Sequence, residues 1–464
     1  NLHIRGEASN LFGSRANDRM MPIWALSGRW NMKQDILRSV DWVDDMALRG
    51  SFGYQGNMLS NQTPNMIIRQ ETDYTGKYGE FNSKVAHYPN PDLRWEKTAS
   101  TNVTLDFSFL KNKINGSVSW YYKKTRDAFL TKTISEINGT TQYVVNSGTL
   151  VNKGIEVSLN FTPINRVGLD GGKRGFVWRI DPQLGQVLNE LVNNAINNRN
   201  NVLRDEIEYT DMLTGDVDIA GEPLNTFYSY RFKGLSPVDG SPIFYGAEDE
   251  LQEELSKKYN NMEREDVFLE VMERSGRREP YLQGGVSNYF GYRNFGLSFN
   301  LAYSLGNKIR LLKLCTEYGT TNPNPASNLR REFVNRWRKP GDENYTNIPA
   351  LNTVAGAHAS PWWNSGTNVT HRIASNIYEM YDNSDIRVVS GNYLRLSSLS
   401  FRYVDDRFCK KLGLKSAYIN LTGTNLFTIA HKKLRGQDPT QSGSSPSVNL
   451  SVRPTYSCNL SITF

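Results

Sequence analysis

The last nine residues of the chain alternate strictly between apolar and small polar side chains. Successive side chains of a β-strand point to opposite faces, so this segment predicts a strand with one apolar and one polar face. A free apolar edge strand would invite aggregation in a soluble sheet. In a closed barrel in lipid, apolar side chains point outward and an aromatic residue suits the interface. The apolar set is Tyr456, Cys458, Leu460, Ile462 and Phe464, and the polar set is Ser457, Asn459, Ser461 and Thr463.

The same alternation recurs along the chain. In each segment one parity is mainly apolar, and the other consists mainly of Ser, Thr, Asn, Asp, Glu and Lys. Such a polar set does not suit the dry core of a β-sandwich, but it suits the wall of a water-filled lumen. The alternating segments are residues 24–30, 48–54, 102–109, 114–123, 155–161, 297–305 and 419–424.

The low overall hydropathy agrees with this prediction. Hydrophobic residues make up 38% of the 464 residues, and the mean hydropathy is −0.55. No apolar run reaches the ~20 residues that a membrane-spanning helix needs. A barrel strand needs only every second residue to be apolar over ~10 residues, so its mean hydropathy stays low. A soluble all-β protein is the alternative at this point.

Charge and reactive residues exclude several classes of function. The net charge is +7, but Lys and Arg are scattered and form no basic helix or RNA-binding motif, so no nucleic-acid partner is expected. Cys315, Cys409 and Cys458 are far apart and show neither metal-ligand spacing nor a disulfide framework. The five histidines are scattered too, without an HExxH motif. The sequence therefore predicts no metal and no cofactor.

The connections between strands alternate between short and long. Short turns on one side and long loops on the other are typical of outer-membrane barrels. If residues 226–246 form two strands joined at Pro237–Gly240, about fourteen strands result, and every long loop falls on one side. The fold class is thus all-β, a transmembrane antiparallel barrel, with loop-stiffening helices expected in residues 248–273 and 327–338. The long connections are residues 58–95, 127–150, 190–225, 247–279, 307–388 and 428–452.

Several segments resemble the SusC/RagA-type TonB-linked outer-membrane proteins. Residues 90–98, Asn-Pro-Asp-Leu-Arg-Trp-Glu-Lys-Thr, are similar to an NP-L-WE-T signature of that family. Residues 148–156 resemble its G-NKGIE strand entry, and residues 48–57 its LR-S-G--GN strand. The carboxy-terminal series matches residues 393–403 and 425–427, together with Gln437-Asp-Pro439. The matches span nearly the whole chain in family order.

The resemblance implies a 22-stranded barrel, of which residues 1–464 would be the carboxy-terminal part. The chain begins as a strand in progress without an initiator Met, and an amino-terminal plug and a TonB box are expected in sequence outside it. The resemblance also implies a SusD-like surface lipoprotein as a hinged lid, energy from TonB, the barrel-assembly machinery and outer-membrane lipid as partners, and a source in Bacteroidota. Its cargo would be oligosaccharides or oligopeptides.

Three functions remain open at this stage. The first is active import through a SusC-like transporter, and the second is a SusC-like barrel that acts as a structural or assembly scaffold without transport. An intact upstream TonB box would separate these two. The third, a glycan-active enzyme or soluble sandwich, is disfavoured because no GxSxG elbow is present. The neighbouring carboxylates Asp44 with Asp45 and Asp405 with Asp406 fall at predicted short turns, where surface charge explains them better than glycosidase chemistry.

Candidate contact residues are few. Trp362 and Trp363 follow Pro361 in a long loop, and sugars stack on aromatic faces. Alternatively, both indoles pack the loop or contact the lid. For the flanking His358 and His371, solvated loop histidines are favoured over metal ligands. Tyr78, Tyr88 and Trp95 are assigned to the outer aromatic belt. Tyr456, Leu460, Ile462 and Phe464 are assigned to the barrel-closing strand and its assembly signal, with Cys458 facing lipid.

Overall fold

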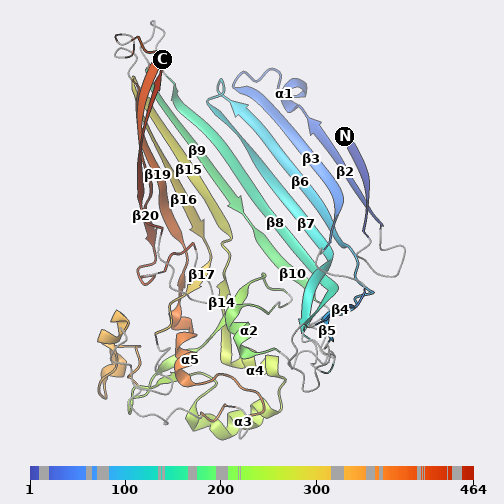
Figure 1. Ribbon diagram of the computed structural model, residues 1–464, viewed down its shortest axis with the longest axis vertical. Helices are drawn as coiled ribbons and strands as arrows, with labels where there is room; N and C mark the ends of the chain where they lie inside the picture. Colours follow the sequence, from blue (N-terminus) through green and yellow to red (C-terminus); the bar gives the residue numbers. More distant parts are fainter. Residues whose placement is uncertain are drawn as a thin grey trace. The chain divides into compact units, whose positions relative to one another are not determined.

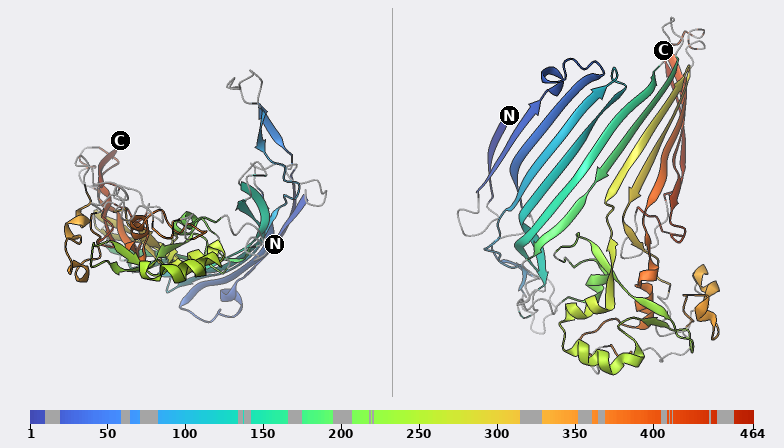
Figure 2. Two further views of the ribbon diagram at one scale, coloured as in Figure 1. Left: turned by 90° about the horizontal axis from the view of Figure 1, so that it is seen from below. Right: turned by 180° about the vertical axis from the view of Figure 1, so that it is seen from behind.

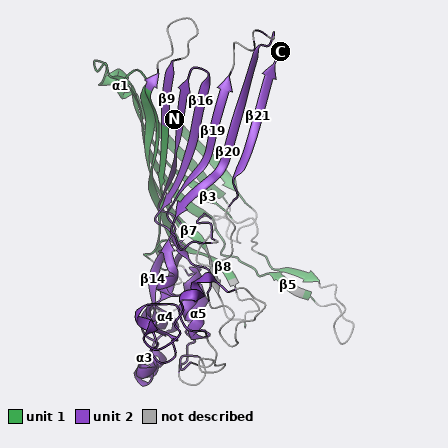
Figure 3. Ribbon diagram, turned by 90° about the vertical axis from the view of Figure 1, so that its left-hand side faces the viewer, with its two compact units in different colours: residues 1–163, 181–203, 219–223 green, residues 164–180, 204–218, 224–464 purple. Residues whose placement is uncertain are grey.

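The computed structural model describes two compact units, which Figure 3 colours separately. Unit 1 comprises residues 1–163, 181–203 and 219–223, and unit 2 comprises the remainder. No helix among the described residues is long and apolar enough to span a membrane. The described residues are 1–9, 20–58, 65–70, 83–133, 137, 142–165, 175–194, 207–217, 219, 221–314, 329–351, 361–364, 369–404, 409, 411, 413–435, 437–440 and 452–464.

Unit 1 is built on an antiparallel sheet whose neighbouring strands follow one another along the chain (Figure 1). A small hairpin of β4 (Ile67–Gln70) and β5 (Ser83–His87) and the short helix α1 (Met32–Asp35) complete it. The sheet strands are β1 (Leu2–Ala8), β2 (Met20–Trp30), β3 (Val43–Asn57), β6 (Glu96–Phe109), β7 (Ile114–Thr133), β8 (Gln142–Asn165) and β10 (Leu188–Asn194), which pairs with β8.

The predicted short turn between β6 and β7 is confirmed. Leu110, Lys111 and Asn112 take positive φ angles of 55°, 59° and 60°, the left-handed region that tight turns use. The Asp44 carboxylate accepts a hydrogen bond of 2.8 Å from the Asn112 backbone N–H. Asp44 therefore serves the turn, as the sequence analysis expects of a surface carboxylate.

Unit 2 contains a second run of antiparallel strands: β15 (Leu282–Tyr292), β16 (Phe295–Leu305), β19 (Tyr393–Val404), β20 (Ser416–Ala430) and β21 (Thr455–Thr463). Within the 13-stranded sheet, β9 (Phe176–Gln186) stands between β8 and β15 in the strand order. The last strand is thus confirmed as a strand, with Leu460 opposite Ile419 of β20.

Unit 2 also contains a body of short elements, here called the loop body, which gathers at the end of these strands away from the carboxy terminus of β21 (Figures 1 and 2). Its helical elements are α2 (Tyr209–Thr214), η5 (Asp249–Leu251), α3 (Gln252–Asn260), α4 (Arg264–Val271), η6 (Arg331–Asn335), η7 (Asp342–Asn344), α5 (Ile377–Asp382) and η8 (Asp385–Arg387). Its strands are β11 (Thr226–Tyr230), β12 (Phe232–Leu235), β13 (Pro242–Phe244), β14 (Met272–Arg277), β17 (Lys308–Arg310) and β18 (Val388–Ser390).

The assignment of residues 226–246 to the barrel wall is wrong. Residues 226–246 supply no strands to the large sheet, which has 13 strands among the described residues where about fourteen are expected. β11 pairs with β14, and β12 pairs with β13 across the predicted turn at Pro237–Gly240. All five residues of β11 are buried. A strand that is buried on both faces cannot separate lipid from water. The local sequence pattern of residues 226–246 therefore did not predict their position correctly.

The two predicted loop helices have different outcomes. Helices are confirmed in residues 248–273, where η5, α3 and α4 cover 249–260 and 264–271. In the described part of this segment, residues 329–338, the only helical element is the short turn η6, with Phe333 buried and Val334 61% exposed. Tertiary packing overrides the helical period there, because Trp337 lies against Gly240, where an added Cβ would come within 2.4 Å of the indole.

Candidate functional site

The strongest candidate site is the polar face of the unit 1 sheet. In the β6–β7–β8 register, Thr104 stands opposite Ser119, which stands opposite Glu156. Apolar side chains of the other parity, Val103 and Trp120 among them, are exposed. The two-faced pattern predicted from the sequence is therefore present in the folded sheet.

Cross-strand pairs hold the polar face in place. The hydroxyls of Thr104 and Ser119 are 3.0 Å apart. The Arg49 guanidinium lies 2.6 Å from the Asp106 carboxylate, and both side chains remain partly exposed. Such exposed pairs contribute only about 0–1 kcal/mol each. The face is consequently a solvated wall that keeps hydrogen-bonding groups available, and not a dry core.

A cavity of about 530 Å³ lies against this wall. The Lys123 ammonium lies 5.6 Å from the centre of the Tyr121 ring. The Tyr121 hydroxyl donates to the Gln186 carbonyl over 3.3 Å. Hydroxyl, amide, charged and aromatic groups here can bind a polar solute, but no nucleophile is paired with a base. The lining residues are Asn102, Thr104, Ser119, Tyr121, Lys123, Asn152, Glu156 and Val187.

The loop body has a different construction, centred on the buried Arg310. Its Nη2 donates to the carbonyl of Tyr228 at 2.7 Å and to that of Leu213 at 3.2 Å. The guanidinium also lies 5.2 Å from the centre of the Phe227 ring. Burial lowers the pKa of Arg310 to about 10, so the side chain stays charged at neutral pH. Sequence reasoning missed this residue, although an arginine beside Ile309 and Leu311 is a signal of a buried cation.

A second buried arginine, Arg387, forms an ion pair with Glu332 of η6 over 2.6 Å. Burial alone would raise the pKa of Glu332, but the charges and hydrogen bonds of Arg387 and Arg330 outweigh burial and hold this pKa below its usual value. The same pair raises the pKa of Arg387 against the opposing effect of burial. The pair fastens η6 to η8.

The Gln-Asp-Pro segment of the resemblance joins the loop body to β19. The Gln437 side chain accepts from the Leu312 N–H at 2.9 Å and donates to the Arg310 carbonyl at 3.0 Å. The fully buried Asp438 accepts from Arg395 of β19 at 2.8 and 2.9 Å. The pKa of Asp438 is lowered because hydrogen bonds from Thr440 and the Arg395 charge outweigh the effect of burial. These residues position the loop and have no free group for chemistry.

The structure buries both candidate tryptophans. Trp362 is 6% and Trp363 3% exposed. The Trp362 ring stacks on Tyr259 of α3 at 6.4 Å, and Trp363 meets Trp362 edge-on at 5.7 Å. This packing fits the alternative that the indoles fix the loop. Contact with cargo or a lid stays a prediction.

The structure gives no support for a metal site at the histidines or at the neighbouring carboxylates. Nε2 of His371 lies 3.2 Å from the Met262 carbonyl oxygen. Within the described part of the chain, no group of three His, Cys, Asp or Glu residues could hold a metal. His358, Asp405 and Asp406 lie outside the described residues.

The aromatic-belt assignment is wrong for Trp95. This indole is buried against Met21 and Leu93, so it packs a small cluster at the start of β6. Tyr88 is half-buried, and Tyr78 lies outside the described residues.

Side chains of both parities of the last strand are exposed, the apolar ones included. Tyr456, Leu460 and Ile462 are exposed, and Phe464 is 81% exposed. Cys458 is exposed on the same parity. An apolar row of this size in contact with water would be an aggregation site, so lipid is its natural surroundings. Its role in barrel closure and assembly stays a prediction.

Two-faced strands with tight turns at one end and long connections at the other define an outer-membrane β-barrel. Residues 23–246 match the family model "TonB dependent receptor-like, beta-barrel". The chain is 24% identical to TonB-dependent receptor P3 of Formosa agariphila over 94% of its own length and 40% of that relative. It is 25% identical to TonB-dependent receptor SusC of Bacteroides thetaiotaomicron over 66% of its length and 29% of that relative.

Solved structures agree in fold. The structure of the RagAB peptide transporter superposes with a TM-score of 0.73 at 19% identity and covers 100% of this chain and 45% of that one. The open-open state of the RagAB peptide importer gives a TM-score of 0.71 at 20% identity. Residues 23–246 thus carry a TonB-dependent receptor-like β-barrel located in the outer membrane, and the chain is similar to SusC in sequence and to RagAB in fold. It spans less than half the length of the relatives that it matches.

Proposed function

We propose that this chain forms a wall and outer loops of a TonB-dependent importer of large nutrients. The observation that carries the proposal is the solvated polar face of unit 1 with its cavity of about 530 Å³. A lumen-facing wall of hydroxyls, amides and partly exposed ion pairs lets a polar solute exchange hydrogen bonds as it moves. The likeness to relatives named SusC and TonB-dependent receptor supports import as the function.

A barrel wide enough for oligomeric cargo must be plugged when idle. We infer that a plug and a TonB box belong to the full-length protein, that TonB supplies the energy, and that a SusD-like lipoprotein closes the outer side. No bond of the cargo need change, so no catalytic role is proposed. Oligosaccharides and oligopeptides both fit, because the cavity offers hydroxyl and amide partners together with the Tyr121 ring.

The test uses the full-length protein in a deletion strain, with labelled oligosaccharide and oligopeptide pools and with TonB present or absent. Import that needs TonB is expected for one pool. Ser119→Trp should fill the cavity and lower import several-fold at unchanged surface level, while Ser119→Ala should not. Import that continues without TonB would overturn the proposal. If the deletion strain lost an outer-membrane complex but imported both pools as before, the alternative of a structural scaffold without transport would be favoured.

A further inference from the structure

Four cations lie on the apolar, lipid-facing side of unit 1: Lys97, Lys124, Arg126 and Lys153, here called the basic cluster. Lys97 of β6 stands directly opposite Arg126 of β7. Lys124 precedes Arg126 by two residues, so both point to the same face. Lys153 of β8 is the diagonal neighbour of Lys124, because Lys124 pairs with Val151. All four share the parity of Val103 and Trp120 and not that of the polar wall.

The basic cluster lies toward the outer side of the membrane. Lys97 follows the long connection that precedes β6, and Arg126 lies toward the end of β7, away from the tight β6–β7 turn. Long connections face outward in outer-membrane barrels. Aromatic residues, which favour the membrane interface, follow on the same face at Tyr122 and Trp120. The cluster is therefore placed at the level of outer-leaflet headgroups.

The charges of the basic cluster are not cancelled locally. Among the ion pairs of the described residues, none involves these four side chains, and three of them are exposed. Asp127 is engaged by Arg94 at 2.6 Å. Glu190, opposite Val151 on β10, shares this face, but no ion pair of the described residues joins it to the four cations. A lipid-facing cation is costly at the membrane centre, but at the interface it attracts anionic headgroups.

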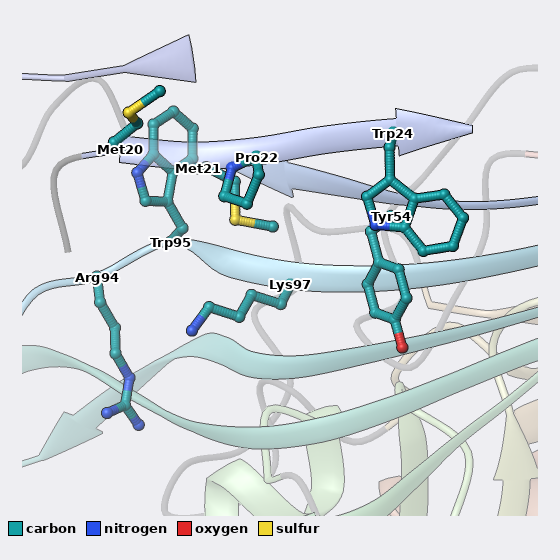
Figure 4. A pocket seen from close by; sticks show the side chains of 8 residues that line it. All are labelled: Met20, Met21, Pro22, Trp24, Tyr54, Arg94, Trp95 and Lys97. Atoms are coloured by element: carbon teal, nitrogen blue, oxygen red, sulfur yellow. The ribbon is translucent and has the colours of Figure 1, made fainter. Parts of the chain in front are cut away.

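A pocket of about 400 Å³ joins the basic cluster to apolar surface. Figure 4 shows Lys97 and Arg94 beside the rings of Trp24, Tyr54 and Trp95. The wall is completed by Met20, Met21 and Pro22. A cationic end with an aromatic and thioether wall suits an amphiphile that has an anionic head and an apolar chain.

A second hollow, of about 600 Å³, continues along the same face. Gly28 stands opposite Gly50, and a Cβ added at either would meet nothing within 4 Å. Leu26, Phe52 and Val103 line this hollow. Val103 is six residues from Lys97, about 20 Å along the strand at ~3.3 Å per residue. That spacing suits a headgroup above and an acyl chain below within one leaflet of a bilayer core about 30 Å thick.

We propose that the basic cluster and the glycine hollow form a binding site for a phosphorylated lipid of the outer leaflet. The phosphates would lie among Lys97, Lys124, Arg126 and Lys153. An acyl chain would follow the Trp24 and Tyr54 side chains into the hollow at Gly28 and Gly50. The site lies on the opposite face from the polar wall, so it is independent of cargo transport.

The experiment measures binding of bis-phosphorylated lipid A to the detergent-purified full-length protein by native mass spectrometry, with the dephosphorylated lipid as a parallel probe. The triple variant Lys97→Gln, Lys124→Gln, Arg126→Gln should bind at least about tenfold more weakly, because each interfacial cation contributes several-fold. Lys123→Gln, which removes a cation from the polar face of the same strand, should change binding less than twofold. Gly50→Leu should weaken binding of lipid A, because the leucine side chain would fill the hollow where the acyl chain is placed.

Heat-modifiable migration on a gel checks that each variant has folded. If the triple variant does not fold, Lys97→Gln and Arg126→Gln alone carry the test, each with an expected several-fold loss. The proposal is overturned if the folded variants bind lipid A as tightly as the parent protein. Equal binding of the dephosphorylated lipid would overturn it too. The proposal is also overturned if inorganic pyrophosphate displaces lipid A when both are present at the same concentration. The site would then recognise free phosphate and not a lipid.

Discussion

β7 in unit 1 and β11 in unit 2 illustrate two ways in which this chain stabilises a strand. Along β7, apolar side chains such as Trp120 are exposed on one face and polar side chains such as Ser119 line the other. Along β11, every residue is buried against other parts of the loop body. The β7 pattern depends on two solvents, lipid and water, whereas β11 depends on ordinary burial. The two regions should therefore respond differently to the same kind of substitution.

The largest difference is expected for Trp363→Ala. Removing a buried indole should cost the loop body about 3–5 kcal/mol, because the packing around it cannot close completely. Limited proteolysis should then cut within the loop-body residues 207–277, while heat-modifiable migration of the barrel stays unchanged. Trp120→Ala on the lipid-facing side of β7 is the matched control, and it should leave the loop body protected.

The neighbouring Trp362 tests whether the tryptophan pair contacts cargo. Trp362→Phe keeps most of the packing on Tyr259, so loop protection should persist. Cargo affinity should then stay within twofold of the parent protein. A tenfold loss with the loop intact would replace the packing interpretation with a ligand contact.

A smaller effect is expected on the barrel for Val118→Lys. Val118 lies on the apolar parity of β7, and a lysine facing lipid near the membrane centre costs about 2–4 kcal/mol. The neighbouring Ser119→Lys places the same charge on the polar face and should cost much less. Urea-dependent folding into lipid vesicles measures both variants. Equal losses would mean that the two faces do not meet different solvents.

The pair of Glu332 and Arg387 gives the loop body a pH dependence. The folded-state pKa of Glu332 is below its unfolded value, so the pair stabilises at neutral pH and is lost as pH falls through the lowered pKa. Glu332→Gln should cost about 1–2 kcal/mol at pH 7, less than for a fully buried pair, because Glu332 is partly exposed. Hydrogen exchange of η6 and η8 should show this loss.

The loss of hydrogen-exchange protection at acid pH provides the control for this prediction. Between pH 7 and pH 3 the parent loop body should lose protection, while Glu332→Gln should lose less over the same range. Identical slopes for the two proteins would show that other carboxylates, such as Asp438 with its lowered pKa, dominate the acid sensitivity.

The comparison also explains what the sequence could predict. Strand alternation is a local signal, so the two faces of β7 and the last strand could be located from residue parity alone. The β11–β14 pairing and the short η6 turn depend on contacts between distant segments, such as Trp337 with Gly240. The sequence singled out the tryptophan pair as a candidate contact, but it could not predict that Trp362 packs on Tyr259. Arg310 escaped notice because one arginine in an apolar segment has no periodic signature.

The smallest change in stability is expected at the end of β21, for Phe464→Asp. A charge near the membrane interface costs only about 0–1 kcal/mol, so the assembled barrel should remain stable. Phe464 is nevertheless 81% exposed on the apolar parity, where assembly machinery could recognise it. We therefore expect surface levels to fall several-fold while the protein that does assemble migrates normally. Thr463→Asp, which places the charge on the polar parity, should assemble like the parent protein. Normal surface levels of Phe464→Asp would mean that the aromatic end of the strand serves its contact with lipid and not assembly.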